Sequence, residues 1–189
     1  MTTLNDNALC TRLQVKNYMG INQADATLDN LIHDIINRVS TAFETYCGRT
    51  FRALDYTEYH DGGVVALFPD QNPINSITSI HEDSDWVYGS DKLVDSSDYK
   101  LMDEKYIVFD KFLSIGEGAI KLVYNAGYTT IPLDITEAAI QEIGRKLKHR
   151  KDFDEQSKTQ GDGTVTYVSL DFLPQTLRTL NSYKLFRAL

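Results

Sequence analysis

The sequence has few of the residues that cross-link a chain or hold a metal ion. It contains two cysteines, Cys10 and Cys47, which form neither a CxxC pair nor the dense pattern of a disulfide-stapled scaffold. Its four histidines are too far apart to supply a helical ligand pair for zinc. We therefore expect a reduced, intracellular chain with no bound metal and no cofactor.

Long apolar runs and a positively charged start are also missing. No stretch approaches the roughly 20 apolar residues that a helix needs to span a bilayer. The first residues, MTTLNDNALCTRLQV, do not have the pattern of a signal peptide. We expect a soluble protein that has no membrane partner and is not secreted by a standard signal.

Positive charge is in short supply as well. Lys and Arg number 19 against 27 Asp and Glu, which gives a net charge of -8 at pH 7. This disfavours tight, sequence-independent binding to nucleic acid, because such binding depends on cations that neutralise phosphates. The imbalance is greatest from Asp55 to Asp110, with 13 acidic residues and 3 Lys. We interpret this region as a solvated acidic β surface; a functional acidic surface is the alternative.

Recognisable catalytic motifs are absent too. The sequence has no GxSxG elbow, no phosphate-binding loop and no GxGxxG fingerprint. Cys47 falls on an apolar stripe and has no indicated partner base. The cluster from His81 to Asp85 is the densest group of oxygen ligands, but it lacks the spacing of a calcium loop. We predict that the protein is not an enzyme; a metal-dependent small hydrolase using Glu82 to Asp85 is the alternative.

Helical periodicity, in contrast, is strong near the start of the chain. From Leu28 to Cys47, apolar residues recur at spacings of three and four, which predicts an amphipathic helix. Thr27 or Asp25 can cap this helix, and Gly48 can end it in a left-handed conformation.

Three shorter helices are predicted elsewhere. One covers 13–21 and closes at Gly20. After Pro132, Asp134 can cap a helix that runs to about Lys151, with Glu137 completing a capping box. The last helix begins at Pro174.

The middle of the chain, 51–128, changes to strand-like runs. Asp61-Gly62-Gly63 predicts a hairpin turn between the first two runs, and the later turn signals favour an antiparallel meander. The polar segment 152–164 is interpreted as a mobile loop, and 165–172 as a short strand. The predicted fold class is α+β, a helical-bundle frame with an inserted antiparallel β-strand region.

Three motifs stand in order along this frame: LQVKNYMGI, the helix end FETYCGRTF, and the junction VYNAGYTTIPLDITEAAIQEIGRKL. In this order they resemble the head–tail connector proteins of tailed bacteriophages, also called head completion or adaptor proteins. The matching residues are Val15, Lys16, Tyr18, Tyr46, Gly48, Arg49, Tyr124, Ala126, Gly127, Tyr128, Pro132, Asp134 and Ala138.

The resemblance implies a structural virion protein without catalytic activity. It implies a homo-oligomeric ring, such as a dodecamer, that docks under the portal, extends the DNA channel and offers an attachment platform to the stopper or tail. Its partners would be further copies of itself, the portal protein and a stopper or tail completion protein. DNA would pass without tight binding, which suits the acidic composition.

The resemblance also implies a location and a domain plan. The location is the head–tail interface of the virion, after assembly in the host cytoplasm. Residues 1–189 would form a single head–tail connector domain, with a helical frame at about 1–50 and 132–189 and a strand-rich insertion at about 51–130. Another phage neck or tail completion protein is the alternative within the virion.

The end of the chain carries the candidate docking segment. Apolar residues at a chain end need a partner, either inside the subunit or outside it. We predict that the segment docks on the portal; the alternative is that it packs back on the helix from Leu28 to Cys47, since periodicity alone cannot distinguish the two. The docking residues are Leu173, Leu177, Leu180, Tyr183, Leu185 and Phe186.

Overall fold

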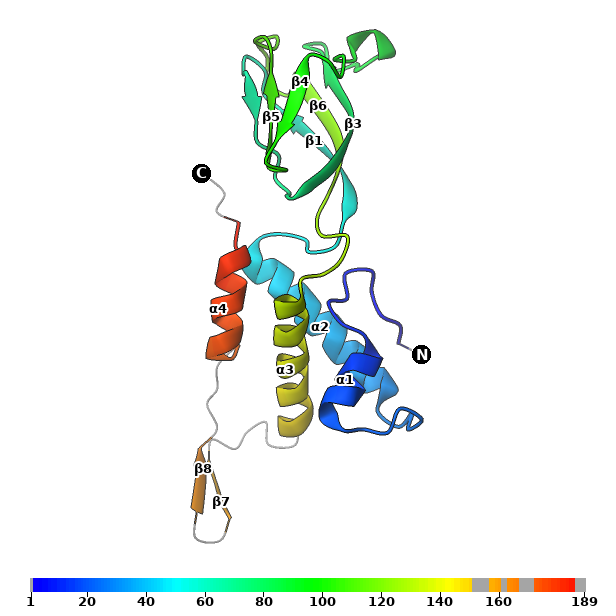
Figure 1. Ribbon diagram of the computed structural model, residues 1–189, viewed down its shortest axis with the longest axis vertical. Coiled ribbons are helices and arrows are strands. Elements are labelled where there is room, and N and C mark those ends of the chain that lie inside the picture. Colours follow the sequence, from blue (N-terminus) through cyan, green and yellow to red (C-terminus); the bar gives the residue numbers. More distant parts are fainter. Residues whose placement is uncertain (1, 151–156, 161–162, 167–171, 186–189) are drawn as a thin grey trace. The chain divides into compact units, whose positions relative to one another are not determined.

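The computed structural model (Figure 1) describes residues 2–150, 157–160, 163–166 and 172–185. The predicted α+β class is confirmed. The helices of the described residues are α1 (Arg12–Met19), α2 (Asp29–Cys47), α3 (Leu133–His149) and α4 (Pro174–Tyr183), with a short 3₁₀ helix η1 (Ser90–Lys92). The strands are β1 (Leu54–His60), β2 (Ala66–Leu67), β3 (Ile74–Glu82), β4 (Tyr99–Met102), β5 (Tyr106–Phe109), β6 (Ile120–Ala126), β7 (Ser157–Gln160) and β8 (Gly163–Thr166).

The described residues divide into two units. The helical unit comprises Met1–Arg49 and Ile131–Phe186, and the β unit comprises Thr50–Thr130. The β unit is therefore inserted in sequence between two parts of the helical unit. That the whole chain acts as one connector domain stays a prediction.

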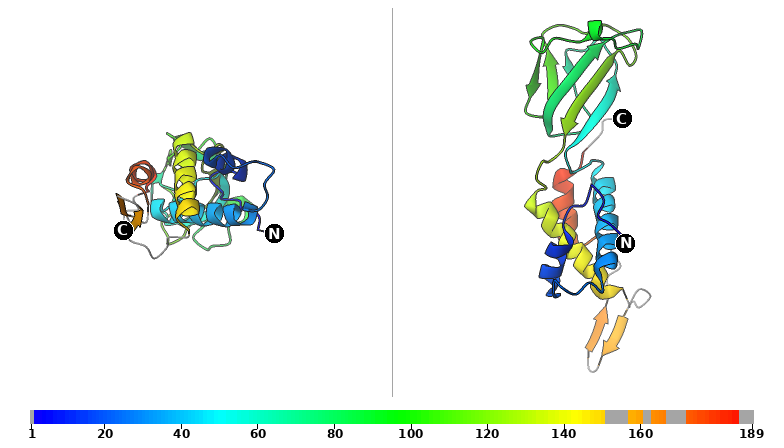
Figure 2. Two further views of the ribbon diagram at one scale, coloured as in Figure 1. Left: turned by 90° about the horizontal axis from the view of Figure 1, so that it is seen from below. Right: turned by 90° about the vertical axis from the view of Figure 1, so that its right-hand side faces the viewer.

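The helical unit is built around the apolar face of α2. Ile32, Ile36, Phe43 and Cys47 are all fully buried, so the predicted stripe is confirmed as core. In Figure 1, α3 lies between α1 and α4, and α2 runs obliquely across them, in contact with all three. Figure 2 shows the same bundle from two further directions. Gly48 ends α2 in the left-handed conformation, with φ of 66°, as predicted.

The predicted caps of α2 and α3 are wrong. Helix α2 begins after Leu28 with no side-chain cap, and Asp25 instead accepts the N–H of Thr27 at 2.9 Å. Helix α3 begins directly after Pro132 and has no side-chain cap either. Asp134 therefore lies inside the first turn, where its carboxylate accepts the hydroxyl of Tyr183. The same carboxylate accepts the N–H of Ile135 at 2.9 Å, so Asp134 bonds both its own first turn and α4.

The β unit contains two three-stranded antiparallel sheets, ordered β1-β6-β3 and β2-β5-β4. The predicted meander is wrong, because β6 pairs with both β1 and β3. Of the consecutive strand pairs within this unit, only β4 and β5 form a hairpin. The core lies between the sheets, as side chains of both build one cluster: Leu67, Ile74, Ile80, Val94, Ile107, Phe109, Leu113, Ile120, Leu122, Tyr124 and Ala126.

The hairpin predicted at Asp61-Gly62-Gly63 is wrong as well, because β1 and β2 belong to different sheets. The two glycines admit another segment of the chain instead. The N–H of Gly62 donates to the carbonyl of Gly116 at 2.8 Å, and that of Gly63 to Leu113 at 3.0 Å. A Cβ on Gly62 would lie 1.7 Å from the carbonyl oxygen of Ser114, so the close approach requires glycine.

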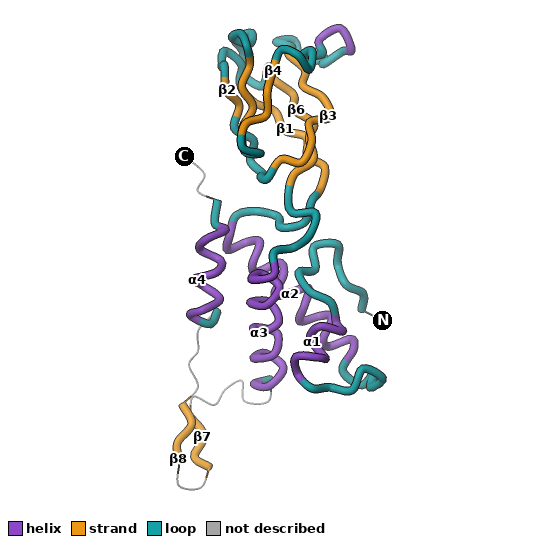
Figure 3. The backbone as a smooth tube through the Cα atoms, viewed as in Figure 1, coloured by secondary structure: helices purple, strands orange, loops and turns teal. Residues whose placement is uncertain are grey.

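Part of the segment predicted as a mobile loop, 152–164, forms a hairpin. Strands β7 and β8, which Figure 3 colours orange, pair antiparallel with Ser157 opposite Thr166. The strand predicted over 165–172 overlaps the end of β8, and 167–171 lie outside the described residues.

A polar network fixes β1 to β6 inside the β unit. The fully buried Tyr124 of β6 donates its hydroxyl to Glu58 of β1 and accepts the N–H of Gln71 at 3.1 Å. Glu58 also accepts the N–H of Asp70 at 3.1 Å and bonds His60 at 2.9 Å. Burial opposes ionisation of Glu58, but these hydrogen bonds outweigh it and lower the pKa of the carboxyl group.

We expect Tyr124→Phe to lower the free energy of unfolding of the β unit by about 1–3 kcal/mol, because the N–H of Gln71 and an oxygen of Glu58 lose their partner. Urea unfolding followed by the fluorescence of Trp86, the one tryptophan of the chain, measures this. Since the pKa of Glu58 is lowered on folding, its contribution is present above the unfolded value of about 4.3 and is lost as the pH falls through the folded pKa. The difference should therefore shrink as the pH is lowered below about 4.3.

The matched control is Tyr59→Phe, because the side chain of Tyr59 is exposed. This change should leave the unfolding midpoint unaltered. Equal midpoints for Tyr124→Phe and the wild type at pH 7 would contradict the role given to the network.

Candidate partner-docking segment

The predicted docking residues occupy different positions in the helical unit. Leu180 is fully buried, whereas Leu173, Leu177, Tyr183 and Leu185 keep part of their surface exposed. Phe186 lies outside the described residues. The segment therefore brings one side chain into the core and leaves four with some accessible surface.

Helix α4 is held at its start by a buried carboxylate of α3. Glu142 is fully buried, and it accepts the backbone N–H of Leu173, the residue that precedes α4. The same side chain is paired with Arg145 at 3.0 Å. Sequence analysis missed this residue, although its spacing from Ala138 and Ala139 places it on the buried face of α3. A carboxylate on such a face indicates a polar partner within the fold.

The end of α4 is bonded to the end of α2. The thiol of Cys47 donates to the carbonyl of Leu180 at 3.5 Å, and the N–H of Leu185 donates to the carbonyl of Cys47 at 2.9 Å. The hydroxyl of Tyr46 donates to Asn181 at 2.8 Å. In this structure the segment packs on α2 and α3, and docking of its exposed side chains on a partner stays a prediction.

Aromatic contacts add to this packing. The ring of Phe172 meets those of Phe43 and Tyr46 edge-on, with centroids 5.4 and 5.8 Å apart. The ammonium group of Lys184 lies over the same Tyr46 ring, 4.8 Å from its centroid. Both ends of the segment therefore contact the last turns of α2.

The first sequence motif also has a structural role. Lys16 is buried, and its ammonium group bonds the carbonyls of Gln23 and Asp25 at 3.2 and 2.6 Å. It also forms an ion pair with Asp29 at 2.5 Å, and Arg12 pairs with the other oxygen of that carboxylate. A single lysine thus fixes the loop between α1 and α2 as well as the first turn of α2.

The junction motif acts through its glycine. Gly127 has φ of 112°, a conformation that side-chain-bearing residues rarely adopt. A Cβ at this position would lie 2.4 Å from the carbonyl oxygen of Arg52. The motif therefore permits the close approach of the segments that enter and leave the β unit, and a ligand is not needed to explain it.

The acidic cluster considered for a hydrolase braces its own loop. The carboxylate of Asp83 accepts the N–H groups of Asp85, Val87 and Tyr88 at 3.0, 3.1 and 2.9 Å. These bonds, led by the one from Asp85, hold the pKa of Asp83 below its ordinary value. Glu82 accepts the N–H of Ser114. Among the described residues, no group of three His, Cys, Asp or Glu side chains is arranged to hold a metal ion.

The thiols are not activated. Burial raises the pKa of Cys47 to about 11, against a smaller opposing effect of Arg49, and raises that of Cys10 to about 12. Since the thiolate is the nucleophile, both side chains behave as small apolar residues near neutral pH.

Among the described residues, no helix combines the length and the apolar character that crossing a membrane requires.

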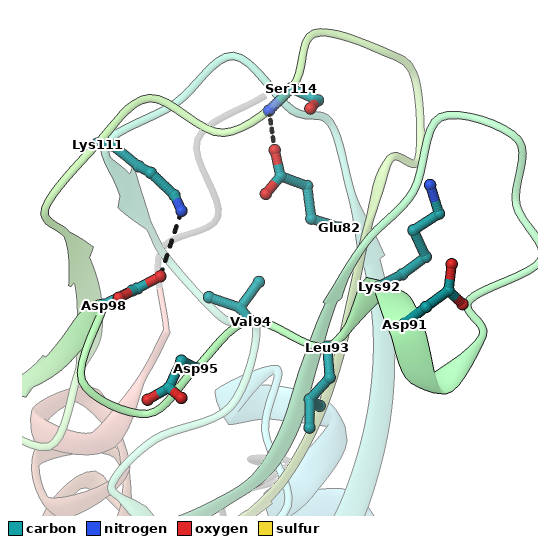
Figure 4. Close-up of a pocket in the computed structure, with 9 residues that line it drawn as sticks. All are labelled: Glu82, Asp91, Lys92, Leu93, Val94, Asp95, Asp98, Lys111 and Ser114. Carbon is teal, nitrogen blue, oxygen red and sulfur yellow. Dashed lines mark hydrogen bonds and ion pairs between the residues drawn. The ribbon is translucent and has the colours of Figure 1, made fainter.

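An open pocket in the β unit is lined mainly by charged residues, and four of these six, Glu82, Asp95, Asp98 and Lys111, have hydrogen-bonded partners (Figure 4). Lys111 bonds Asp98 at 3.2 Å, and Glu82 bonds the backbone of Ser114. The carboxylate of Asp95 accepts the hydroxyl of Ser97 at 2.8 Å. Most of the charged lining is therefore engaged in bonds within the β unit. The lining residues are Glu82, Asp91, Lys92, Leu93, Val94, Asp95, Asp98, Lys111 and Ser114.

The chain was compared with known protein families and with known proteins. The family model described as head completion protein matches residues 8–186. No curated protein matches the sequence.

Three solved structures share the fold. A chain in the neck of an empty gene transfer agent (GTA) particle, computed with C6 symmetry, is 14% identical with a TM-score of 0.63, and the match covers 99% of this chain and 95% of that chain. A chain in the virion of a native GTA particle is 11% identical with a TM-score of 0.64, at 99% and 95% coverage. A chain in the neck of a native GTA particle, computed with C12 symmetry, is 14% identical with a TM-score of 0.62, at 100% and 95% coverage.

We expect Leu180→Ala to lower the free energy of unfolding of the helical unit by about 2–5 kcal/mol, because a large buried side chain is truncated among α2, α3 and α4. The exposed Arg178 on the same helix is the matched control, and Arg178→Ala should change the stability by less than about 0.5 kcal/mol. Urea unfolding followed by circular dichroism in the helical region measures both.

Truncation after Phe172 extends the same test. The shortened chain should melt at a lower temperature than Leu180→Ala, because the bonds from Glu142 and Cys47 are lost as well. A shortened chain with an unchanged melting temperature would show that the helical unit does not need α4, and would favour its use on a partner.

Proposed function

Because the chain belongs to the head completion protein family, whose model matches residues 8–186, we propose that it is a structural protein of the neck of a tailed bacteriophage. In this proposal it forms a homo-oligomeric ring beneath the portal, extends the DNA channel, and provides the platform to which the stopper or tail attaches. The family match over nearly the whole chain is the observation that carries the proposal. The protein would act at the head–tail interface of the virion, after assembly in the host cytoplasm.

A ring is supported by the symmetry of the structures that share the fold. The necks in question were computed with C6 and C12 symmetry. A ring of identical subunits uses head-to-tail contacts that close by rotation. We propose a dodecamer, which matches the higher of the two symmetries.

A passive channel is supported by charge. A protein that encloses moving DNA should not hold its phosphates tightly, because each neutralised phosphate adds to the affinity. The chain has 27 acidic against 19 basic residues. Its net charge of -8 at pH 7 therefore favours passage over retention.

A structural role without catalysis is supported by the state of the reactive groups. Asp83 and Glu82 are hydrogen-bonded to backbone N–H groups of their own or a neighbouring loop. Both cysteines have raised pKa values because they are buried. Glu82, Asp83 and the two cysteines are therefore engaged in the fold, whereas the side chain of Asp85 is exposed.

The portal contact is the finer part of the proposal. We assign it to the exposed surface of the segment 173–185, where Leu173, Leu177, Tyr183 and Leu185 are partly accessible. An apolar surface of this kind suits a groove on a partner. A tail completion protein, the second candidate, would bind isolated tails instead of heads.

The proposal predicts the outcome of removing the gene from its virus. Heads should package DNA but remain tailless, and addition of the purified chain should restore tail attachment, which electron microscopy of the particles measures. Reconstruction of the restored necks should show the protein as a closed ring, of twelve copies if it follows the C12 symmetry of the similar neck. The Tyr59→Phe chain, altered only at an exposed hydroxyl, is the control and should restore tails equally well.

Two results would overturn the proposal. Heads that acquire tails normally without the protein would remove it from the neck. Binding of the purified chain to isolated tails and not to tailless heads would identify it as a tail completion protein.

Binding of the free protein to DNA tests the passive channel separately. Because acidic residues predominate, no binding to a 30-base-pair duplex should be detected by fluorescence anisotropy at physiological salt. Micromolar binding that weakens steeply with added salt would contradict a channel that lets DNA pass freely.

A further inference from the structure

One end of the β unit displays large apolar side chains to solvent. Three loops meet there: 61–65, 83–98 and 110–119, and we call this region the loop end. Antiparallel pairing brings the loops together, because His60 and Glu82 both lie opposite Ile120 in the register. The exposed apolar residues of the loop end are Val65, Trp86, Val87, Leu93, Phe112 and Ile115.

These side chains are far more exposed than the side chains of the core. Val87, Phe112 and Ile115 are 76%, 74% and 87% exposed. Single exposed apolar residues need no explanation, but six of them on three joined loops form a surface of the kind that proteins use for association.

The loop end is held in one shape by hydrogen bonds. The indole N–H of Trp86 donates to the carbonyl of Glu117 at 2.8 Å. The hydroxyl of Tyr88 donates to the carbonyl of Gly118 at 2.5 Å. Trp86 and Tyr88 have positive φ values of 60° and 51°, which are uncommon for aromatic residues, and the carboxylate of Asp83 bonds the intervening backbone. A surface ordered in advance loses little conformational entropy when a partner binds.

Most of the charged residues in the three loops are acidic. The three loops contain 8 acidic residues and 2 Lys, and one of these lysines, Lys111, is paired with Asp98. The whole β unit has 14 acidic and 6 basic residues, a net charge of -8 that equals the net charge of the complete chain. The rest of the chain is therefore neutral in sum, and the negative potential is concentrated on this unit.

This charge pattern selects among possible occupants. Nucleic acid and anionic lipid headgroups would be repelled, because both present phosphates. A second loop end would be repelled by its own like charge. A protein surface with basic residues around an apolar centre would be attracted by the acidic residues of the loop end, which we call its acidic rim. Such a surface would also cover the exposed apolar side chains.

We propose that the loop end is a docking surface for another protein of the virion, and that the partner presents an apolar recess bordered by Lys and Arg. The choice of a virion protein rests on the proposed function; the chemistry of the recess rests on the loop end alone. This site lies in a different unit from the segment 173–185 and would provide the second contact that a platform between two partners requires.

Trp86 reports on the occupant directly, because it is the one tryptophan of the chain and lies on this surface. Quenching of its fluorescence by acrylamide is measured for the full chain over a range of protein concentrations. The same measurement is made with duplex DNA and with vesicles of phosphatidylcholine and phosphatidylglycerol. We expect Trp86 to stay accessible in all three series. Shielding at high protein concentration would identify a second copy as the occupant, and shielding by DNA or vesicles would identify phosphates; each result would overturn the proposal.

Binding to particles tests the partner itself. Tailless, DNA-filled heads and isolated tails of the same virus are each sedimented with the wild-type chain and with a triple variant, Val87→Ser, Phe112→Ser and Ile115→Ser. Because a few apolar anchors carry most of the energy of an interface, the triple variant should bind about tenfold or more weakly to one of the two particles. The double variant Leu13→Ser and Leu133→Ser, which alters exposed apolar residues of the helical unit, is the matched control and should leave that binding unchanged.

A charge variant completes the design. Asp85, Asp91 and Asp110 are exposed, and their conversion to Asn should weaken binding and flatten its dependence on salt, because the attraction of the basic rim is reduced. If the wild-type chain binds and the triple variant binds equally well, the loop end is not the docking surface, whatever the status of the neck assignment. If the wild-type chain binds neither heads nor tails, the proposed function fails together with this inference.

Discussion

The pairing of β1 with β6 is the constraint on which the two-unit arrangement depends. These are the first and last strands of the β unit, and their antiparallel register runs from Leu54 opposite Ala126 to His60 opposite Ile120. Beyond these strands, a separate parallel bridge joins Arg52 to Tyr128, in which the N–H of Tyr128 donates to the carbonyl of Phe51 at 2.7 Å and the N–H of Ala53 donates to the carbonyl of Tyr128 at 3.1 Å. The chain therefore enters and leaves the β unit at one place, so that α2 and α3, which are remote in sequence, can pack in one helical core.

Sequence reasoning succeeded where a structural feature depends on neighbouring residues. The apolar stripe of α2, its end at Gly48 and the start of α4 at Pro174 are encoded within one or two turns of chain. It failed where the partner is distant: the runs before and after Gly62 read as a hairpin, but β1 pairs with a strand about 60 residues further on. Strand alternation indicates which face is buried, and it does not identify the neighbouring strand.

The candidate surfaces show the same division. Apolar residues at the chain end were recognised from sequence, but periodicity does not reveal the bonds that hold this segment to the helical unit, such as the one between Glu142 of α3 and Leu173. The loop end was noticed for its acidic residues alone. Its apolar side chains come from three separate loops, and their common position follows from the strand order that sequence reasoning did not obtain.

The residues that carry the family resemblance are largely those that constrain the backbone or the core. Lys16 is buried among carbonyls, Gly48 is left-handed, and Gly127 leaves room for the carbonyl of Arg52. Substitution at such positions disturbs the fold, so a pattern of this kind can persist while most other residues change. Contact surfaces are not held in this way, because a partner can change with them. Membership of the family therefore follows from positions inside each unit, whereas the identity of the partners must be sought in exposed features, such as the acidic rim and the apolar centre of the loop end.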